Sequence, residues 1–116
     1  LPVNIDCFRF TQVISNFLNN ANKFTKEGTI TLGCRIYKEH QEVCVYVKDT
    51  GKGIDDKELM MIFDRFYKTD EFEQGSGLGL SICKVIIERL AGRIEVYSEV
   101  GKGSCFSVIL SLANII

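Results

Sequence analysis

Two glycine-rich stretches, each attached to a regular element, constrain the fold of this chain more than any other feature. The first follows an apolar strand pattern and begins with a carboxylate: Asp49-Thr50-Gly51-Lys52-Gly53-Ile54. The second opens directly into a predicted helix: Gly75-Ser76-Gly77-Leu78-Gly79-Leu80. Backbone N–H groups at a helix N-terminus favour anions by geometry and by dipole. A carboxylate that can accept a hydrogen bond from a nucleotide base, together with a glycine-rich loop that can bind phosphate, indicates a nucleotide-binding site.

Size and charge limit the kind of protein to which such a site belongs. The chain has 116 residues, 46% hydrophobic and 25% charged, which is the composition of one ordinary soluble domain. Its net charge of −1 and lack of long charge runs argue against nucleic acid and anionic membranes as partners. No apolar stretch approaches the roughly 18 residues of a membrane span, and no signal-peptide pattern is present. The start at Leu1-Pro2, without methionine, predicts a domain excised from a larger parent.

The cysteines are predicted to be buried, reduced thiols rather than metal ligands or catalytic groups. Their number is odd, no Cys-x-x-Cys spacing occurs, and their neighbours are apolar, as for free cysteines that pack as small hydrophobes. They are Cys7, Cys34, Cys44, Cys83 and Cys105. This usage is typical of a reducing cytosol.

Hydrophobic periodicity predicts an α+β domain. Apolar residues at three-and-four spacing predict amphipathic helices over residues 6–24 and 77–90, the second ended by Ala91-Gly92. Alternating apolar residues predict two hairpins, with strands over residues 29–37, 43–47, 93–98 and 104–112. Asp6 is a candidate cap for the first helix, and Asp55 with Glu58 forms a capping-box pattern for a short helix through Met61. This order of elements favours helices on one face of a mostly antiparallel sheet.

A row of polar side chains lies on the first predicted helix. Gln12, Asn16, Asn20 and Lys23 are three and four residues apart, so they share one face. Asparagine is a poor interior helix former, because its side chain competes for backbone hydrogen bonds. The row is either a solvated face, or a set of side-chain carbonyls that hold a hydrated magnesium ion against phosphate.

The other polar positions also have two interpretations. Asp49 is either a turn aspartate or an acceptor for the exocyclic amine of adenine. Arg65 and Lys68 are either surface charges or neutralise a triphosphate. The loop over residues 75–80 is not a dinucleotide fingerprint, because its third glycine is missing and no strand leads directly into it. It is not a P-loop either, since no Gly-Lys-Ser/Thr follows.

Four stretches, in one order and together covering essentially the whole chain, resemble the motifs of sensor histidine kinases. The segment Asn16-Phe17-Leu18-Asn19-Asn20-Ala21-Asn22-Lys23-Phe24-Thr25 resembles their N box. The stretch that begins at Asp49 resembles the G1 box. Phe63-Asp64-Arg65-Phe66-Tyr67-Lys68 resembles the F box, and Gly75-Ser76-Gly77-Leu78-Gly79-Leu80-Ser81 the G2 box.

The resemblance implies that residues 1–116 form the ATP-binding catalytic domain of a two-component sensor histidine kinase. The implied fold is the Bergerat two-layer α/β sandwich of gyrase-type and mismatch-repair ATPases, with a mostly antiparallel mixed sheet. By the family pattern, Asn20 coordinates Mg²⁺ with help from Asn16, Lys23 and Lys68 contact phosphates, and Asp49 binds adenine. Residues 69–76 correspond to the ATP lid. The other implied ATP contacts are Gly51, Gly53, Ile54, Arg65, Tyr67, Gly75, Ser76, Gly77, Leu78, Gly79 and Leu80.

The implied activity is transfer of the γ-phosphoryl group to a histidine on a separate helical dimerisation domain, with a response regulator downstream. We expect the isolated domain to be a cytoplasmic monomer and the parent a homodimer, whose membrane anchoring is left open. In the gyrase-like branch a glutamate at the position of Asn16 activates water. An amide cannot take that proton, and loss of a general base typically costs about 10²–10⁴ in rate. His40, in a predicted turn, is expected to be exposed and not to be the phosphoacceptor.

Two rival functions stay open at this point. An anti-sigma-type serine kinase has the same fold, but the F-box-like stretch argues against it. A degenerate domain that holds nucleotide as a structural or sensory ligand is the second rival, and the intact motif positions argue against that.

Overall fold

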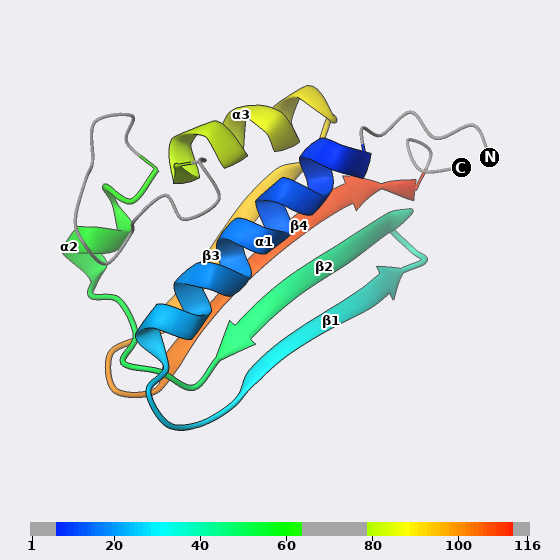
Figure 1. The fold of residues 1–116 in the computed structure, drawn as a ribbon. Helices are drawn as coiled ribbons and strands as arrows, with labels where there is room; N and C mark the ends of the chain where they lie inside the picture. Colours follow the sequence, from blue (N-terminus) through cyan, green and yellow to red (C-terminus); the bar gives the residue numbers. More distant parts are fainter. Residues whose placement is uncertain (1–6, 64–78, 113–116) are drawn as a thin grey trace.

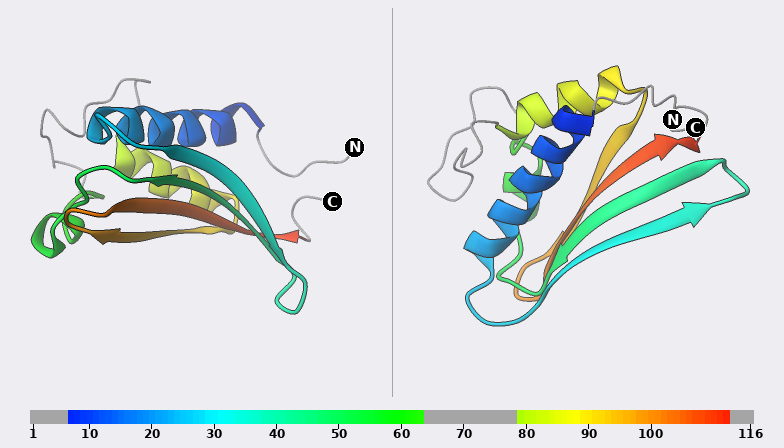
Figure 2. Two further views of the ribbon diagram at one scale, coloured as in Figure 1. Left: turned by 90° about the horizontal axis from the view of Figure 1, so that it is seen from below. Right: turned by 45° about the vertical axis from the view of Figure 1, so that its right-hand side comes forward.

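The structure, a computed structural model, describes residues 7–63 and 79–112 and has two layers (Figure 1). Its elements are α1 (Cys7–Phe24), β1 (Ile30–Tyr37), β2 (Glu42–Asp49), α2 (Asp56–Leu59), α3 (Leu80–Arg89), β3 (Arg93–Glu99) and β4 (Gly103–Ser111). Figure 2 shows α1 and α3 over one face of the sheet, while the other face is open. The predicted α+β class, with helices on one face, is confirmed.

The sheet has the strand order β1-β2-β4-β3, and each neighbouring pair is antiparallel. The parallel pair that a mixed sheet requires is therefore not found among the strands of residues 7–63 and 79–112. The two hairpins meet through β2 and β4. In this register Asp49, the last residue of β2, lies between Ile30 of β1 and Ser104 of β4.

The hydrophobic core lies between the helices and the two central strands. On α1, Val13 and Phe17 are completely or almost completely buried, and the ring of Phe17 lies 5.3 Å from that of Phe106. Cys83 and Ile87 of α3 are also fully buried. Burying a large apolar side chain contributes about 1.5–3 kcal/mol. The apolar stripes predicted for both helices are thus what holds the two layers together.

Strand β1 is more exposed than its alternation predicted. Leu32 and Ile36 lie on the side that faces the helices, yet they are 54% and 60% exposed. Figure 1 shows the reason, since β1 forms the outer edge of the sheet and neither α1 nor α3 is drawn over it. The alternation identified the strand but did not tell which strands the helices cover.

The ends of the helices follow the predicted signals closely. Asp55 caps α2, its Oδ1 accepting the Glu58 N–H at 2.8 Å, and this helix ends at Leu59 rather than Met61. At the end of α3, Ala91 has a φ of 60° and the Gly92 N–H donates to the Ile87 carbonyl at 2.9 Å, which closes the helix. Helix α3 begins at Leu80, and its predicted start at residues 77–78 lies outside the described residues. So does the candidate cap Asp6.

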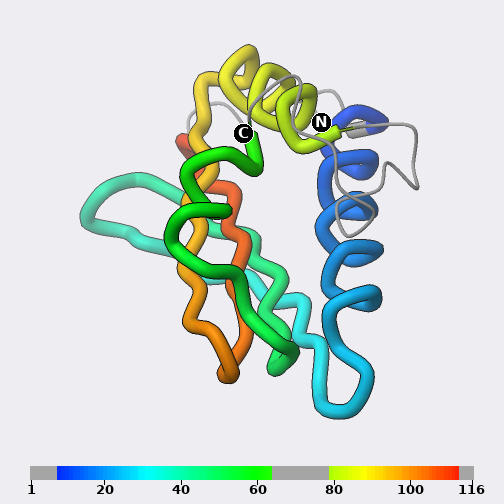
Figure 3. Tube along the Cα trace, turned by 90° about the vertical axis from the view of Figure 1, so that its left-hand side faces the viewer, coloured from blue at the N-terminus to red at the C-terminus, as the bar shows by residue number. Residues whose placement is uncertain are grey.

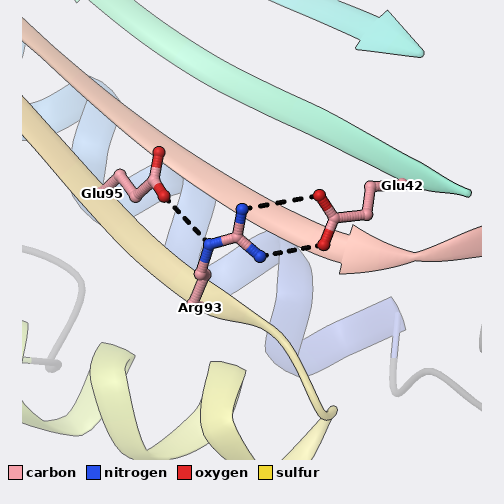
Figure 4. A network of polar contacts seen from close by, with 3 residues as sticks. All are labelled: Glu42, Arg93 and Glu95. Carbon is pink, nitrogen blue, oxygen red and sulfur yellow. Dashed lines mark hydrogen bonds and ion pairs between the residues drawn. The ribbon is translucent and has the colours of Figure 1, made fainter. Parts of the chain in front are cut away.

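The open face of the sheet carries a polar network that joins β2 to β3 across β4 (Figure 4). The Arg93 guanidinium donates to both carboxylate oxygens of Glu42, at 2.9 and 3.4 Å, and to Glu95 at 2.9 Å. The hydrogen bond from Arg93 lowers the pKa of Glu42, and that to Glu42 raises the pKa of Arg93. Because these groups are solvated, we expect them to add little to stability.

The cysteine prediction is confirmed in part. The four cysteines whose side chains are described are free thiols. Cys44 and Cys83 are buried as predicted, whereas Cys34, on the exposed strand β1, is not. Burial raises the pKa of the Cys83 thiol to about 12.

Candidate functional site

Two asparagines of α1 form a buried polar pair one helical turn apart. Asn16 and Asn20 are only 2% and 3% exposed, so a solvated face is the wrong interpretation for them. The Asn20 amide donates from Nδ2 to Asn16 Oδ1 at 3.1 Å. Asn20 Oδ1 is buried and has no hydrogen-bond partner in the described part of the chain. Buried polar atoms nearly always have one, which marks this oxygen as a candidate ligand atom.

The chemistry of this atom fits a magnesium ligand. Mg²⁺ binds oxygen donors and usually retains several waters, so one protein amide oxygen beside phosphate is a suitable site. The hydrogen bond to Asn16 fixes the orientation of the Asn20 amide with its oxygen directed away from Asn16. Lys23 follows Asn20 by three residues in the last turn of α1 and is exposed.

Asp49 is a buried carboxylate at the end of β2. It is 3% exposed, and its Oδ1 accepts the Gly51 N–H at 2.9 Å. Oδ1 of Asp49 therefore makes the contact expected of a turn aspartate. No partner for the other oxygen is found within residues 7–63 and 79–112. Since a buried charge is costly unless it is paired, the second oxygen is available to a ligand.

The G1 loop, residues 49–54, is attached on one side to the end of α1. The Lys52 N–H donates to the Phe24 carbonyl at 3.2 Å, and the Thr50 N–H to the Thr29 carbonyl at 3.1 Å. Thr50 Oγ1 in turn accepts the Thr29 N–H at 2.9 Å. These bonds bring the loop beside the last turn of the helix that carries Asn20 and Lys23. Elements far apart in the sequence thus meet at one end of the molecule.

On its other side the G1 loop contacts the turn between β3 and β4. The Gly101 N–H donates to the Lys52 carbonyl at 2.8 Å, and the Ile54 N–H to Ser98 Oγ at 2.7 Å. Gly53 has a φ of 76° and packs so closely that a Cβ there would overlap the backbone of Glu99. Gly53 and Ile54 were predicted as nucleotide contacts. In the structure both are buried and hold the loop in shape.

Two serines beside the G1 loop were not predicted as site residues from the sequence. Ser98 and Ser104 flank the β3–β4 turn, and Ser104 is 3% exposed and directly opposite Asp49. A signal for them exists in the sequence. Both occupy inward positions of strands whose other inward positions are apolar, such as Val96 and Phe106. A hydroxyl at such a position needs a polar partner in the fold.

The remaining predicted residues lie at or before the start of α3. Gly79 is the N-cap of this helix, and Leu80 belongs to the core. Figure 1 shows the start of α3 on the same side of the molecule as α2, and Figure 3 shows α3 across the top, with the last turns of α1 at the bottom. The other predicted contacts lie outside the described residues: Arg65, Tyr67, Lys68, Gly75, Ser76, Gly77 and Leu78. Their roles stay predictions.

Other kinds of site find no support in the part of the chain that the structure describes. Within it, no cluster of three or more histidine, cysteine, aspartate or glutamate side chains is suited to hold a metal ion. Its helices also lack the combined length and apolar character that crossing a bilayer demands.

Comparison with known families identifies the family of this fold. The model of the family described as histidine kinase-, DNA gyrase B-, and HSP90-like ATPase matches residues 5–114. The chain belongs to this family. It is 46% identical over 110 residues to the sensor protein SrrB of Staphylococcus aureus, a match that covers 90% of this chain and 18% of SrrB.

Solved structures of histidine kinases have the same fold. Full-length ShkA in complex with AMPPNP is 33% identical with a TM-score of 0.76, over 88% of this chain and 21% of ShkA. The nucleotide-free catalytic domain of the histidine kinase ThkA is 30% identical with a TM-score of 0.74, over 92% of this chain and 67% of that domain. The resemblance to sensor histidine kinases is thereby confirmed. The chain spans about a fifth of the length of SrrB and of ShkA.

Proposed function

We propose that this domain binds Mg-ATP and donates the γ-phosphoryl group to a histidine on a separate helical dimerisation domain of the parent protein. The observation that carries the proposal is Asp49, a buried carboxylate with one oxygen unpaired among the described residues, on a loop attached to the end of α1. The complex of the related ShkA with AMPPNP supports a nucleotide as the ligand.

Asp49 is the proposed source of base specificity. Its second carboxylate oxygen accepts a hydrogen bond from the exocyclic amine of adenine. Guanine presents a carbonyl at the corresponding position, so two acceptors would face each other. A buried polar group without a partner costs roughly 1–3 kcal/mol. The domain should therefore prefer ATP and ADP to GTP.

The asparagine pair and the basic residues are the proposed phosphate end of the site. Asn20 Oδ1 would be the protein ligand of Mg²⁺, and Asn16 would hold the Asn20 amide in the orientation that presents this oxygen. When bound, the ion neutralises charge that develops on the transferring phosphoryl group. Lys23, with Arg65 and Lys68, would contact the phosphates.

The Asn16–Asn20 pair also explains why the phosphoryl group would be transferred to a protein histidine rather than to water. The Asn16 side chain is an amide whose Oδ1 already accepts the Asn20 N–H, so it cannot serve as a base toward water. Positioning of the reacting groups supplies most of the catalysis in phosphoryl transfer. A second domain that brings its histidine to the site would provide this positioning. His40 lies exposed in the β1–β2 turn, and we propose no catalytic role for it.

The wider setting follows from the proposed reaction. The phosphorylated histidine would pass its phosphoryl group to a response regulator, and the parent would be a homodimer joined by the helical domain. We place the catalytic domain in the cytoplasm, where ATP is available.

Calorimetric titration of Asp49→Ala tests the proposal. Wild-type domain should bind ATP clearly more tightly than GTP, and Asp49→Ala should lose roughly 10-fold or more in ATP affinity while remaining folded. Asp56→Ala, which removes an exposed carboxylate from α2, is the matched control and should bind ATP like wild type. Equal affinities of wild type for ATP and GTP would contradict the assignment of Asp49.

A further inference from the structure

The side chain of Ser98 attaches the G1 loop to β3. Ser98 Oγ accepts the Ile54 N–H at 2.7 Å, a bond between residues 44 apart in the sequence. The nearby bond from Gly101 to Lys52 involves only backbone atoms. Ser98 is therefore a position at which substitution of a side chain can detach the end of the loop from the sheet.

The same hydroxyl also reaches β4, on which Ser104 lies opposite Asp49 of β2. Ser98 Oγ lies 3.1 Å from the Gly103 carbonyl oxygen and 2.8 Å from Ser104 Oγ. A serine hydroxyl carries one proton, so Ser98 donates to only one of these two acceptors at a time. When Ser98 donates to Ser104, the Ser104 proton is directed elsewhere. When it donates to Gly103, Ser104 can donate to Ser98. The orientation of the buried Ser104 hydroxyl thus depends on Ser98.

We infer that Ser98 is a positioning residue of the nucleotide site. It acts through two neighbours: it holds the Ile54 end of the G1 loop, and it sets the direction of the Ser104 hydroxyl beside Asp49. This inference rests on the proposed binding of ATP at Asp49. It predicts that the choice between adenine and guanine nucleotides depends on a serine that belongs to none of the motif boxes.

The test compares Ser98→Ala with Ser98→Thr, which keeps the hydroxyl and suits a strand. A partly buried N–H that loses its hydrogen-bond partner is destabilised. We therefore expect ATP affinity to fall roughly 10-fold in Ser98→Ala, the preference for ATP over GTP to narrow, and Ser98→Thr to retain most of both. Ser107→Ala, a change on the open face of β4, is the matched control and should leave both unchanged.

Amide hydrogen exchange separates positioning from a general loss of stability. In Ser98→Ala the Ile54 amide should exchange roughly 10-fold faster without nucleotide, while amides in the centre of β2 keep their rates. Uniformly faster exchange, with an unchanged ATP to GTP ratio, would overturn the inference in favour of a merely structural role. If Ser98→Ala does not fold, Ser98→Cys, close in size and a weak acceptor, provides the same comparison.

The outcomes for Ser98 and for the proposed function are distinguishable. Failure of the wild-type domain to bind ATP contradicts the proposed function. ATP binding by wild type, with unchanged affinity, nucleotide preference and Ile54 exchange in Ser98→Ala, overturns only the role of Ser98.

Discussion

Replacement of Gly103 by alanine tests whether the position of Asp49 depends on its close contact with β4. Gly103 is buried and has a φ of 126°, which L side chains rarely adopt. An added Cβ would overlap the Asp49 carbonyl oxygen and would lie 2.9 Å from both the Asp49 carbonyl carbon and Thr50 Cα. These atoms are backbone and cannot rotate away, so the G1 loop or β4 must shift.

Gly101 provides a matched control in the same turn. Its φ of 86° is also unfavourable for alanine, but a Cβ there would meet nothing within 4 Å. Backbone strain of about 1–3 kcal/mol is therefore expected in both variants. Overpacking adds about 1–3 kcal/mol in Gly103→Ala alone. The difference between the two variants isolates the contact with Asp49.

Urea unfolding and ATP calorimetry provide the measurements. A hydrogen bond to the base that is lost or misaligned costs about 1–3 kcal/mol, which is a loss of about 10-fold or more in affinity. We expect that loss of ATP affinity in Gly103→Ala under conditions where it is folded, and wild-type affinity in Gly101→Ala. Equal losses of unfolding free energy, with ATP affinity alike in the two variants, would refute the argument that β4 positions Asp49.

Three further outcomes are expected. Asn20→Ala should keep magnesium-free ADP binding but lose the gain that Mg²⁺ gives to ATP, and unchanged magnesium dependence in calorimetry would rule out Asn20 as a ligand. The isolated domain should release negligible phosphate and show no label on His40 with radiolabelled ATP, while the parent's helical domain, added in trans, should acquire acid-labile phosphohistidine; label on the isolated domain would contradict this. The pKa of Cys83 rises from 9.0 to about 12 on folding, so its contribution to stability is complete below pH 9 and is lost as the pH rises toward 12. Unfolding free energy should therefore decline more steeply over that interval than in Cys83→Ala, and mass spectrometry at pH 8 should find Cys34 alkylated in the native state and Cys83 only after unfolding.

The sequence alone determined the features that arise from local periodicity and local capping. The helix stripe through Val13 and Phe17, the two hairpins and the Asp55 cap each depend on residues within a few positions of one another. The motif boxes likewise placed a carboxylate at the end of a strand and asparagines one turn apart on a helix. The family assignment depended on these local patterns, and the comparisons confirm it.

The burial of these groups was decided by tertiary structure. The row of Asn16 and Asn20 had two interpretations in the sequence, and only the packing of α1 against the sheet shows both side chains buried. The same packing leaves β1 outside the helix layer, so Leu32 is exposed although its strand pattern equals that of β2. Periodicity reports which residues share a face. It does not report what covers that face.

The contacts that hold the G1 loop in place could also be seen only in the tertiary structure. Its contacts come from the end of α1 and from the β3–β4 turn, and the bond from Ile54 to Ser98 spans 44 residues. A glycine next to a lysine reads as an ordinary turn in the sequence. Only the antiparallel pairing of β2 with β4 places Gly103 and Ser104 against Asp49. Strand register is a long-range property, because it is set by how two hairpins pack together rather than by the residues next to the loop.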